Sequence, residues 1–282
     1  MRQETFATPH ELNLSIRCPT GEIELETYEG TETQVDLRVR GDDEGVRELL
    51  AETLIQLRER GDGHELLVEV PRVRGGGGGF FFRRDPEIAL RVRCPHGTSA
   101  DIRTKSADLE GVGRFGRIEA ITTSGDVRFD DVSQDAIIHS TSGDVSIERV
   151  GGTLEVRTTS GDVHLGRAAG AANIALTSGD LVVRDAAGSL TANAVSGDLD
   201  VKAVVEGDVR LQSVSGDVRV GIRRGSRLWV DAKTMSGSTR SELELGDDPV
   251  ESDGPLVELR VNTVSGDVLV QRAASAPAEA AA

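Results

Sequence analysis

The tripeptide Ser-Gly-Asp recurs through the second half of the chain at a fixed interval of eighteen residues. Further copies follow at less regular spacing, including the variant Ser-Gly-Ser at 236–238. A degenerate copy, Ser-Ala-Asp, precedes the regular run at 106–108. A short, fixed period is typical of repeat proteins in which each unit stacks on its neighbours. We therefore expect nine stacked coils, which begin at Ser106, Ser124, Ser142, Ser160, Ser178, Ser196, Ser215, Ser236 and Ser265.

Apolar residues fall three, five, eight, twelve and fourteen positions after the serine of a coil. Val163 and Leu165 flank a polar residue, and Ala172 and Ile174 repeat this spacing in the second half of the same coil. Such alternation is the pattern of a strand with one buried face. Each coil thus predicts two short strands, and successive coils are expected to hydrogen-bond at about 4.8 Å. Aromatic residues make up only 3% of the chain, which suits a thin core of Val, Leu, Ile and Ala.

Two other solenoids with eighteen-residue coils are disfavoured. The left-handed hexapeptide helix needs a small apolar residue every six positions, which these offsets do not provide. The calcium β-roll needs Gly-Gly-x-Gly-x-Asp in both halves of each coil, whereas the second halves here begin Gly152-Thr153, Gly170-Ala171 and Gly188-Ser189. The sequence therefore predicts an all-β, single-stranded, right-handed β-solenoid over residues 101–272.

Residues 1–100 are predicted to form broader, irregular coils of the same sheet. Strand-like alternation is seen at 12–16, 22–26 and 35–39. A short amphipathic helix is expected at about 43–59, capping an open edge or end of the solenoid. Five residues would share its apolar face: Val46, Leu49, Leu50, Leu54 and Leu57. A Gly/Phe/Arg loop follows at 71–85, and the tail at 273–282 is expected to be disordered.

The Ser-Gly-Asp-Val coils, reached through Leu90-Arg91-Val92-Arg93-Cys94-Pro95-His96-Gly97, resemble the DUF4097 family of β-strand-repeat proteins, which are often labelled adhesins. The resemblance covers residues 86–272 well and the N-terminal part loosely. It implies a β-solenoid fold and an uncharacterised role, sometimes suggested to be at the cell envelope, and it carries over no catalytic residues. Residues 1–14 have neither the basic start nor the apolar run of a secretory signal. Because no membrane-spanning stretch follows either, we expect a cytoplasmic protein.

The net charge of −16 argues against nucleic acid as a partner, since a phosphate backbone needs a basic face. It also disfavours general adsorption to anionic lipid. The two cysteines, Cys18 and Cys94, fit no zinc spacing and are expected to be buried thiols. No cofactor is implied.

Three phenylalanines and two arginines follow five glycines, and this basic segment stands out in an acidic chain. A glycine arm that ends in aromatic and arginine side chains suits a groove on a protein partner. Packing of the aromatic rings against an apolar end of the solenoid and contact with a membrane are the alternatives. The residues of this candidate site are Phe80, Phe81, Phe82, Arg83 and Arg84.

The Gly-Asp pairs of the repeat would lie along one edge of the stack. Glycine supplies unusual backbone angles there, and the aspartates are expected to hydrogen-bond turn amides. A calcium ladder is the alternative, because stacked carboxylates repel one another. The residues of this turn ladder are Gly125, Asp126, Gly143, Asp144, Gly161, Asp162, Gly179, Asp180, Gly197, Asp198, Gly216 and Asp217.

No Ser–His–Asp, Cys–His or phosphate-loop signature appears in the sequence. We therefore expect a non-catalytic binding or scaffold protein, which engages a protein partner through the solenoid surface or the Gly/Phe/Arg loop. Two alternatives remain: a rod that self-associates through its exposed ends, and an adhesin-like protein of the envelope.

Overall fold

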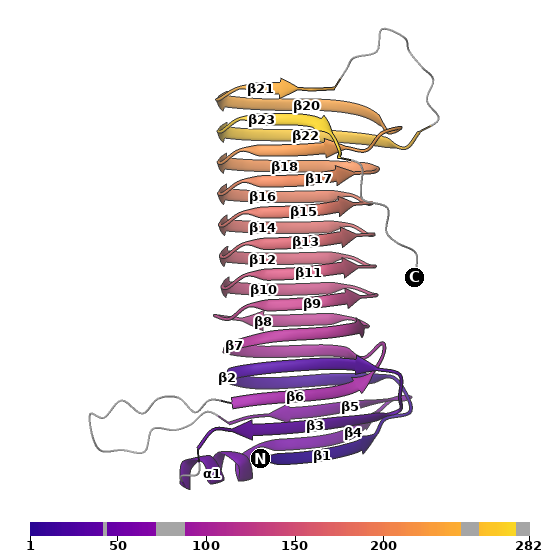
Figure 1. Cartoon of the computed structure of the whole chain (residues 1–282), viewed down its shortest axis with the longest axis vertical. Coiled ribbons are helices and arrows are strands. Elements are labelled where there is room, and N and C mark those ends of the chain that lie inside the picture. The colour runs from indigo at the N-terminus through magenta and orange to yellow at the C-terminus, as the bar shows by residue number, and fades with distance from the viewer. Residues whose placement is uncertain (42–43, 72–87, 244–253, 275–282) are drawn as a thin grey trace, which may run out of the picture. The chain divides into compact units, whose positions relative to one another are not determined.

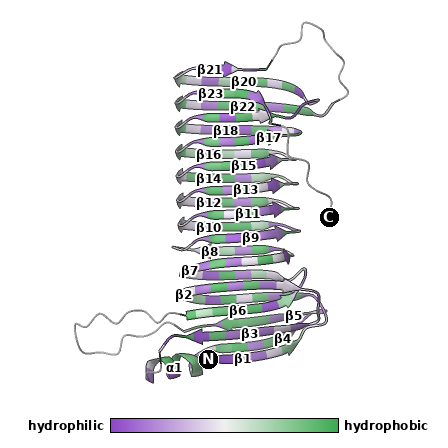
Figure 2. Ribbon diagram, in the orientation of Figure 1, coloured by the Kyte–Doolittle hydropathy of each residue, from purple (hydrophilic) through white to green (hydrophobic). Residues whose placement is uncertain are grey.

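The computed structural model describes residues 1–41, 44–71, 88–243 and 254–274 (Figure 1). The chain divides into two compact units, Met1–Val145 and Ser146–Ala282, and each is built almost entirely of stacked strands. Hydrophobic and hydrophilic residues alternate along these strands (Figure 2). The predicted β-solenoid is thus confirmed as a fold class.

Two strands of 17 residues, β2 (Leu12–Tyr28) and β7 (Ser99–Phe115), form the centre of the first unit. They run parallel in register from Asn13 opposite Ser99 to Glu26 opposite Val112. The two halves of β2 have different neighbours on their other side, so the strand turns from one sheet face to another. The corner is Gly21, whose φ of +115° few other residues adopt.

Shorter strands complete both faces of this unit. The first half of β2 pairs with β5 (Gly63–Glu69), which pairs antiparallel with β4 (Leu54–Arg60). The second half pairs with β6 (Ile88–Pro95), followed by the antiparallel strands β3 (Glu32–Val39) and β1 (Arg2–Ala7). Beyond β7 lie β8 (Ile118–Thr122), β9 (Val127–Val132) and β10 (Ala136–Ser142).

The predicted helix is shorter than expected. Helix α1 spans Glu44–Glu52, whereas Leu54 and Leu57 lie on strand β4. The helix ends at Thr53, whose N–H and hydroxyl both donate to the Leu49 carbonyl, at 3.0 and 2.7 Å. Beyond it, the two-residue turn Gly61-Asp62 folds β4 against β5 as a hairpin, and this pairing overrides the helical pattern.

Helix α1 lies against the strands at this end of the first unit (Figure 1). Its buried residues are Val46 and Leu49, and it contacts β3. The Arg2 side chain on β1 donates hydrogen bonds to the carbonyls of Leu50 and Thr53. The helix therefore contacts β3 and is joined to β1 by the Arg2 hydrogen bonds, while its capping role stays a prediction.

The second unit consists of regular coils of two strands each. From here on a coil is named by the serine of the turn that joins its two strands, so its first strand ends at that serine and its second strand follows the turn. The first strands of successive coils are β12 (Leu154–Ser160), β14 (Ala172–Ser178), β16 (Leu190–Ser196) and β18 (Gly207–Ser215). The second strands are β11 (Val145–Val150), β13 (Val163–Ala168), β15 (Leu181–Ala186), β17 (Leu199–Val204) and β19 (Val218–Ile222). Strand β11 begins at the boundary of the units. Like strands pair in parallel, with Leu154 opposite Ala172 and Ala172 opposite Leu190.

The inward positions predicted from the repeat are the core. Among the residues that follow Ser160, those at all five offsets are at most 2% exposed: Val163, Leu165, Ala168, Ala172 and Ile174. A sixth buried position lies sixteen residues after the serine, here at Leu176, and the offsets deduced from the sequence did not include it. At several other repeats a hydroxyl stands there, and that of Thr158 donates to the Ser160 carbonyl at 3.1 Å.

The last two coils do not stack in chain order. Strand β22 (Leu256–Ser265) pairs with β18 on one side and with β20 (Arg227–Ser236) on the other. Likewise β23 (Val268–Arg272) lies between β19 and β21 (Thr239–Ser241). The expectation that successive coils always pair is therefore wrong here: the coil of Ser265 separates the coils of Ser215 and Ser236.

The sequence of the displaced coil explains its position. Ser238 stands where the other coils carry aspartate, and its N–H donates to Asp267 at 2.8 Å. The turn of a coil without this carboxylate donates its amide to one neighbouring coil, but it has no carboxylate to accept the amide of a coil on its other side. Its second strand also carries Thr239 and Ser241 opposite Val268 and Val270, where other coils are apolar. Both features suit a coil that ends the stack.

Glycine is required in the turns for two reasons, which a pair of variants separates. Gly179 has φ of +127°, and a Cβ there would overlap the Gly161 carbonyl oxygen, whereas Gly225 has φ of +88° and open space around it. We expect Gly225→Ala to lower the free energy of unfolding by about 1–2 kcal/mol, the cost of the backbone angle alone. Gly179→Ala should cost roughly 3 kcal/mol or more. Urea unfolding measures both, and equal losses would contradict the close stacking.

The coil order predicts which cysteine pairs form disulfides. Gln212 lies opposite Asn262, which lies opposite Lys233, and neighbouring strands are about 4.8 Å apart, within disulfide range. We expect Gln212→Cys with Asn262→Cys to cross-link under mild oxidation. Gln212→Cys with Lys233→Cys, two strand spacings apart, should stay reduced. Peptide mapping under non-reducing conditions detects either disulfide. A cross-link between positions 212 and 233, with none between 212 and 262, would show that the coils stack in chain order.

Candidate functional site: a turn ladder and a polar groove

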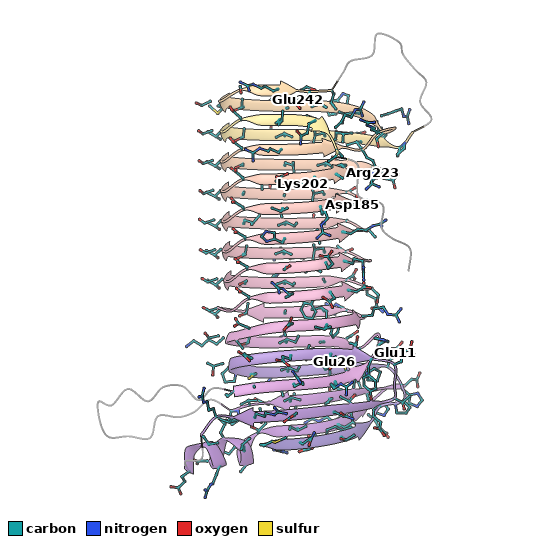
Figure 3. All side chains as sticks on the ribbon, in the orientation of Figure 1. Glu11, Glu26, Asp185, Lys202, Arg223 and Glu242 are labelled. Carbon is teal, nitrogen blue, oxygen red and sulfur yellow. The ribbon has the colours of Figure 1, made fainter. Side chains whose placement is uncertain are left out.

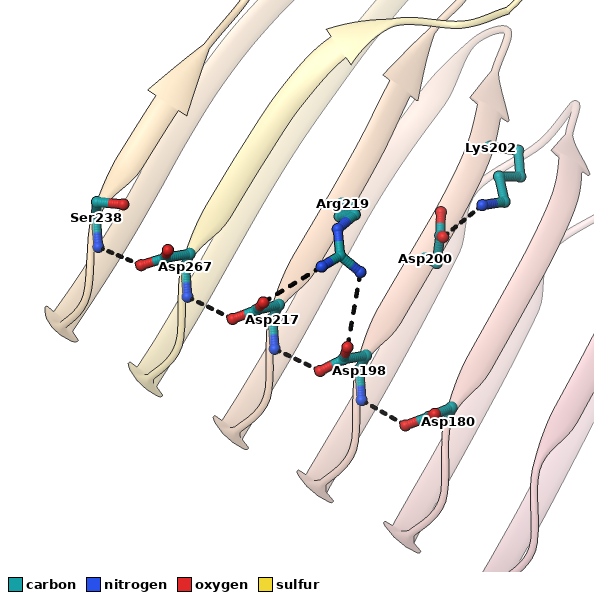
Figure 4. A network of polar contacts seen from close by, with 8 residues as sticks. All are labelled: Asp180, Asp198, Asp200, Lys202, Asp217, Arg219, Ser238 and Asp267. Atoms are coloured by element: carbon teal, nitrogen blue, oxygen red, sulfur yellow. Dashed lines mark hydrogen bonds and ion pairs between the residues drawn. The ribbon is translucent and has the colours of Figure 1, made fainter.

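The aspartates of the repeat form a ladder of carboxylate-to-amide hydrogen bonds along one edge of each unit. In the first unit, Asp108 accepts the N–H of Asp126 at 3.0 Å, and Asp126 accepts that of Asp144 at 2.9 Å. Figure 4 shows the ladder of the second unit from Asp180 to Ser238. Its rungs measure 2.8 or 2.9 Å and join Asp162, Asp180, Asp198, Asp217, Asp267 and Ser238 in that order.

Hydrogen bonds offset the repulsion between these stacked carboxylates. Each Oδ1 oxygen in these rungs accepts an amide, and Arg219 lies between Asp198 and Asp217 at 3.6 and 3.3 Å (Figure 4). The pKa of Asp267 is lowered, first because its carboxylate accepts the Ser238 N–H and then by the Ser238 hydroxyl and nearby Arg240. The ladder therefore stabilises the turns of its own coils. In the part of the chain that the structure describes, no group of three His, Cys, Asp or Glu residues is placed to hold a metal ion.

A groove of about 1000 Å³ lies on the first unit. Its lining comes from turns and strand ends that are far apart in the sequence: the β1–β2 turn, the β4–β5 hairpin, the start of β7 and strand β8. Glu11, labelled in Figure 3, belongs to the first of these turns. The charged and imidazole side chains of the groove are His10, Glu11, Arg60, Asp62, His64, Asp101, Arg117 and Glu119.

Two imidazole rings stack in this groove. The ring centroids of His10 and His64 are 5.6 Å apart, and their planes differ by 9°. Backbone pairing brings the rings together, because the His64 N–H donates to the Glu11 carbonyl at 2.8 Å. His64 Nδ1 is buried and has no hydrogen-bond partner among the described residues.

The arginines of the groove form ion pairs with nearby acids. Arg117 lies 3.1 Å from Glu119, and Arg60 lies 3.2 Å from Glu65. Asp101 lies 3.2 Å from Arg103, which points from the same strand. The groove thus offers fixed donors and acceptors of both charges, which is the chemistry of a surface that binds a polar group.

Comparison with known families decides what kind of protein carries these features. The model of the family described as Toastrack DUF4097 matches residues 13–271. The chain belongs to this family. The resemblance noted from the Ser-Gly-Asp coils is confirmed, and the match also covers most of the N-terminal part. No curated protein matches the chain.

Solved structures with detectable likeness to this Toastrack chain include proteins of Parabacteroides, Bacteroides and Clostridium species. A "putative adhesin" from Parabacteroides distasonis is 12% identical, with 95% of this chain and 96% of that chain covered and a TM-score of 0.46. A "putative adhesin" from Bacteroides fragilis is 15% identical over 95% and 96% of the chains, with a TM-score of 0.40. A "putative cell adhesion protein" from Clostridium sporogenes is 10% identical over 96% and 99%, with a TM-score of 0.27.

The candidate residues of the sequence analysis are found in different places in the Toastrack fold. The Gly-Asp pairs form the ladder described above. Phe80, Phe81, Phe82, Arg83 and Arg84 lie outside the described residues, so their contact with a partner stays a prediction. No helix in the described part of the chain has the length and apolar character needed to cross a membrane.

The histidine pair was missed because the five histidines are scattered along the sequence. His10 and His64 meet only because the β4–β5 hairpin returns the chain to β2. The turn Arg60-Gly61-Asp62-Gly63, followed by alternating apolar residues, was the available signal. This signal predicts a strand in place of the second half of the expected helix, and a second strand after the turn.

Both cysteines of this Toastrack chain are free and buried, as expected. Burial raises the pKa of each thiol from 9.0 to about 11. The Cys18 thiol donates to the Thr20 carbonyl at 3.4 Å, and that of Cys94 to the Glu26 carbonyl at 3.8 Å. The thiols are therefore packing groups of the core.

These raised pKa values predict a loss of stability at alkaline pH. The thiols of the unfolded chain ionise near pH 9, whereas those of the folded protein stay neutral until about pH 11. Their contribution is fully present below pH 9 and is lost as pH rises to 11, on the order of 2 kcal/mol for each thiol. Urea unfolding between pH 8 and 11 measures the fall. A Cys18→Ala/Cys94→Ala variant should show a flatter profile, and an identical slope would contradict the assignment.

Proposed function

We propose that this Toastrack protein is a non-catalytic binding protein, and that the polar groove of its first unit contacts a protein partner. The observation that carries the proposal is the convergence of turns and strand ends on one hollow of about 1000 Å³. Binding residues are often placed on loops that a rigid scaffold positions. The paired strands β2, β5, β7 and β8 supply that scaffold.

The charges of the groove suit the binding of a polar partner. Arg60, Arg117 and Asp101 are held in ion pairs on the surface. Such pairs contribute little to stability, but they fix the direction of donors and acceptors. His64 Nδ1 still lacks a partner among the described residues, so a bound polar atom would satisfy it.

The occupant that fits this lining is a hydrophilic segment of a protein that carries both charges. Its backbone amides and polar side chains can pair with the carboxylates, guanidinium groups and imidazoles of the groove. A mixed lining also gives selectivity, because a segment with one sign of charge meets like charges.

A charge reversal in the groove tests this proposal. Arg117→Glu sets an acid where the groove presents a cation to acidic groups of the partner, and it should weaken binding at least about tenfold, since like charges across an interface are costly. Arg157→Glu in the second unit is the matched control, because Arg157 forms a similar surface pair with Glu155 at 2.9 Å. Affinity capture from a lysate of the source cells, with quantitative mass spectrometry, compares wild type and both variants.

The two outcomes are distinct. Proteins that wild type and Arg157→Glu retain, but Arg117→Glu loses at an unchanged melting temperature, support the groove as the binding surface. If all three proteins retain the same set in the same amounts, the groove is not the site. Because both arginines are exposed, the variants should unfold within about 1 kcal/mol of wild type.

A further inference from the structure

Strand β20 is an open edge of the second unit. It pairs with β22, and among the described residues no strand pairs with its other side. Leu228, Val230 and Ala232 lie opposite the fully buried Val257, Leu259 and Val261. Val230 is nevertheless 40% exposed, because no further coil covers it. An edge of this kind is a template for another strand.

The backbone of β20 offers hydrogen bonds at this edge. The Arg227 N–H donates to the Pro255 carbonyl at 2.9 Å, on the side of β22. In a parallel ladder the direction alternates from residue to residue, so the next residue, Leu228, points its N–H and C=O away from β22. The same holds for Val230, Ala232 and Thr234, since the register with β22 is continuous.

The outward side chains of β20 are complementary to themselves. Asp231 and Lys233 lie between Trp229 and Met235 on this face, and Lys233 Nζ lies 2.9 Å from Asp231. In an antiparallel pair with a two-fold axis at Ala232, Asp231 lies opposite Lys233 of the second copy, and the reverse pair forms as well. Trp229 then lies opposite Met235 of the second copy, a favourable sulfur–aromatic contact.

Other two-fold registers lack this match. An axis at Asp231 or at Lys233 sets that residue opposite its own copy, with like charges in direct contact. An axis at Val230 places Lys233 opposite Arg227 of the second copy, and an axis at Thr234 leaves Asp231 opposite Gly237. The axis at Ala232 also aligns the free amides, because even-numbered residues face even-numbered residues and exchange both hydrogen bonds.

We propose that β20 joins two copies of this chain in a closed, two-fold dimer with Ala232 at its axis. The contact is isologous, so it uses the edge in both copies and does not continue into a filament. This inference does not rest on the binding role of the groove. Trp229 is the only tryptophan in the chain, and Arg260 lies over its ring at 5.1 Å, so its emission reports on the interface.

A charge swap tests the dimer and its register. Sedimentation velocity and Trp229 emission are measured over a range of concentrations for wild type, Asp231→Lys, Lys233→Asp and the double variant. Each single variant sets like charges opposite each other twice and should raise the dimer dissociation constant at least about tenfold. The double variant restores both pairs in reversed order and should dimerise like wild type.

Two further variants separate interface effects from effects on folding. Asp200→Lys is the matched control, because Lys202 Nζ lies 2.5 Å from Asp200 on β17 (Figures 3 and 4), away from the open edge, and we expect it to dimerise normally. Ala232→Pro removes an amide that only the interface uses, and proline is tolerated on edge strands, so it should melt like wild type but stay monomeric.

Two results would overturn the proposal. One is a wild-type protein that sediments as a monomer at every concentration. The other is a dimer that the single charge variants and Ala232→Pro leave unchanged, or that the double variant fails to restore.

Discussion

The regular stacking of this Toastrack chain depends on how closely the turn of one coil approaches the turn of the next. The carbonyl oxygen of Gly161 occupies the space that a Cβ on Gly179 would need, and Gly179 relates to Gly197 in the same way. The aspartate after each glycine then accepts the amide of the following coil at 2.8–3.0 Å. Because this contact fixes the register at the start of each coil, every inward residue falls on the same buried column.

A turn that is the same in each coil also allows coils to stack out of chain order. The Gly266 turn approaches Gly216 as closely as Gly197 approaches Gly179, although the coil of Ser236 intervenes in the sequence. The carboxylate decides which coil lies last, because the coil with Ser238 provides no carboxylate to accept a further amide. Because the coil with Ser238 lies last, β20 is an open strand edge. This end of the stack is therefore the region of the second unit that suits self-association.

The sequence predicted what depends on the repeat and missed what depends on contacts between distant segments. The column that includes Val163 and Ile174 followed from periodicity, because a two-residue alternation at constant spacing has few structural solutions. Leu54 and Leu57 have helical spacing, yet pairing with β5 outweighs it. The groove around His10 and His64 depends on that same hairpin. A residue pattern within a single segment could therefore not predict it. The coil order was readable in Ser238, but only once the role of the aspartate was known.

Amide hydrogen exchange on dilute, monomeric protein tests whether the coil without the carboxylate ends the stack. We expect slow exchange for every amide from 257 to 262, because β22 is paired on both sides. The amides of Leu228, Val230, Ala232 and Thr234 on β20 should exchange fast, while those of Trp229 and Asp231 are protected. Fast exchange at alternate residues of β22, with β20 protected throughout, would show instead that the coils stack in chain order, with β22 at the end.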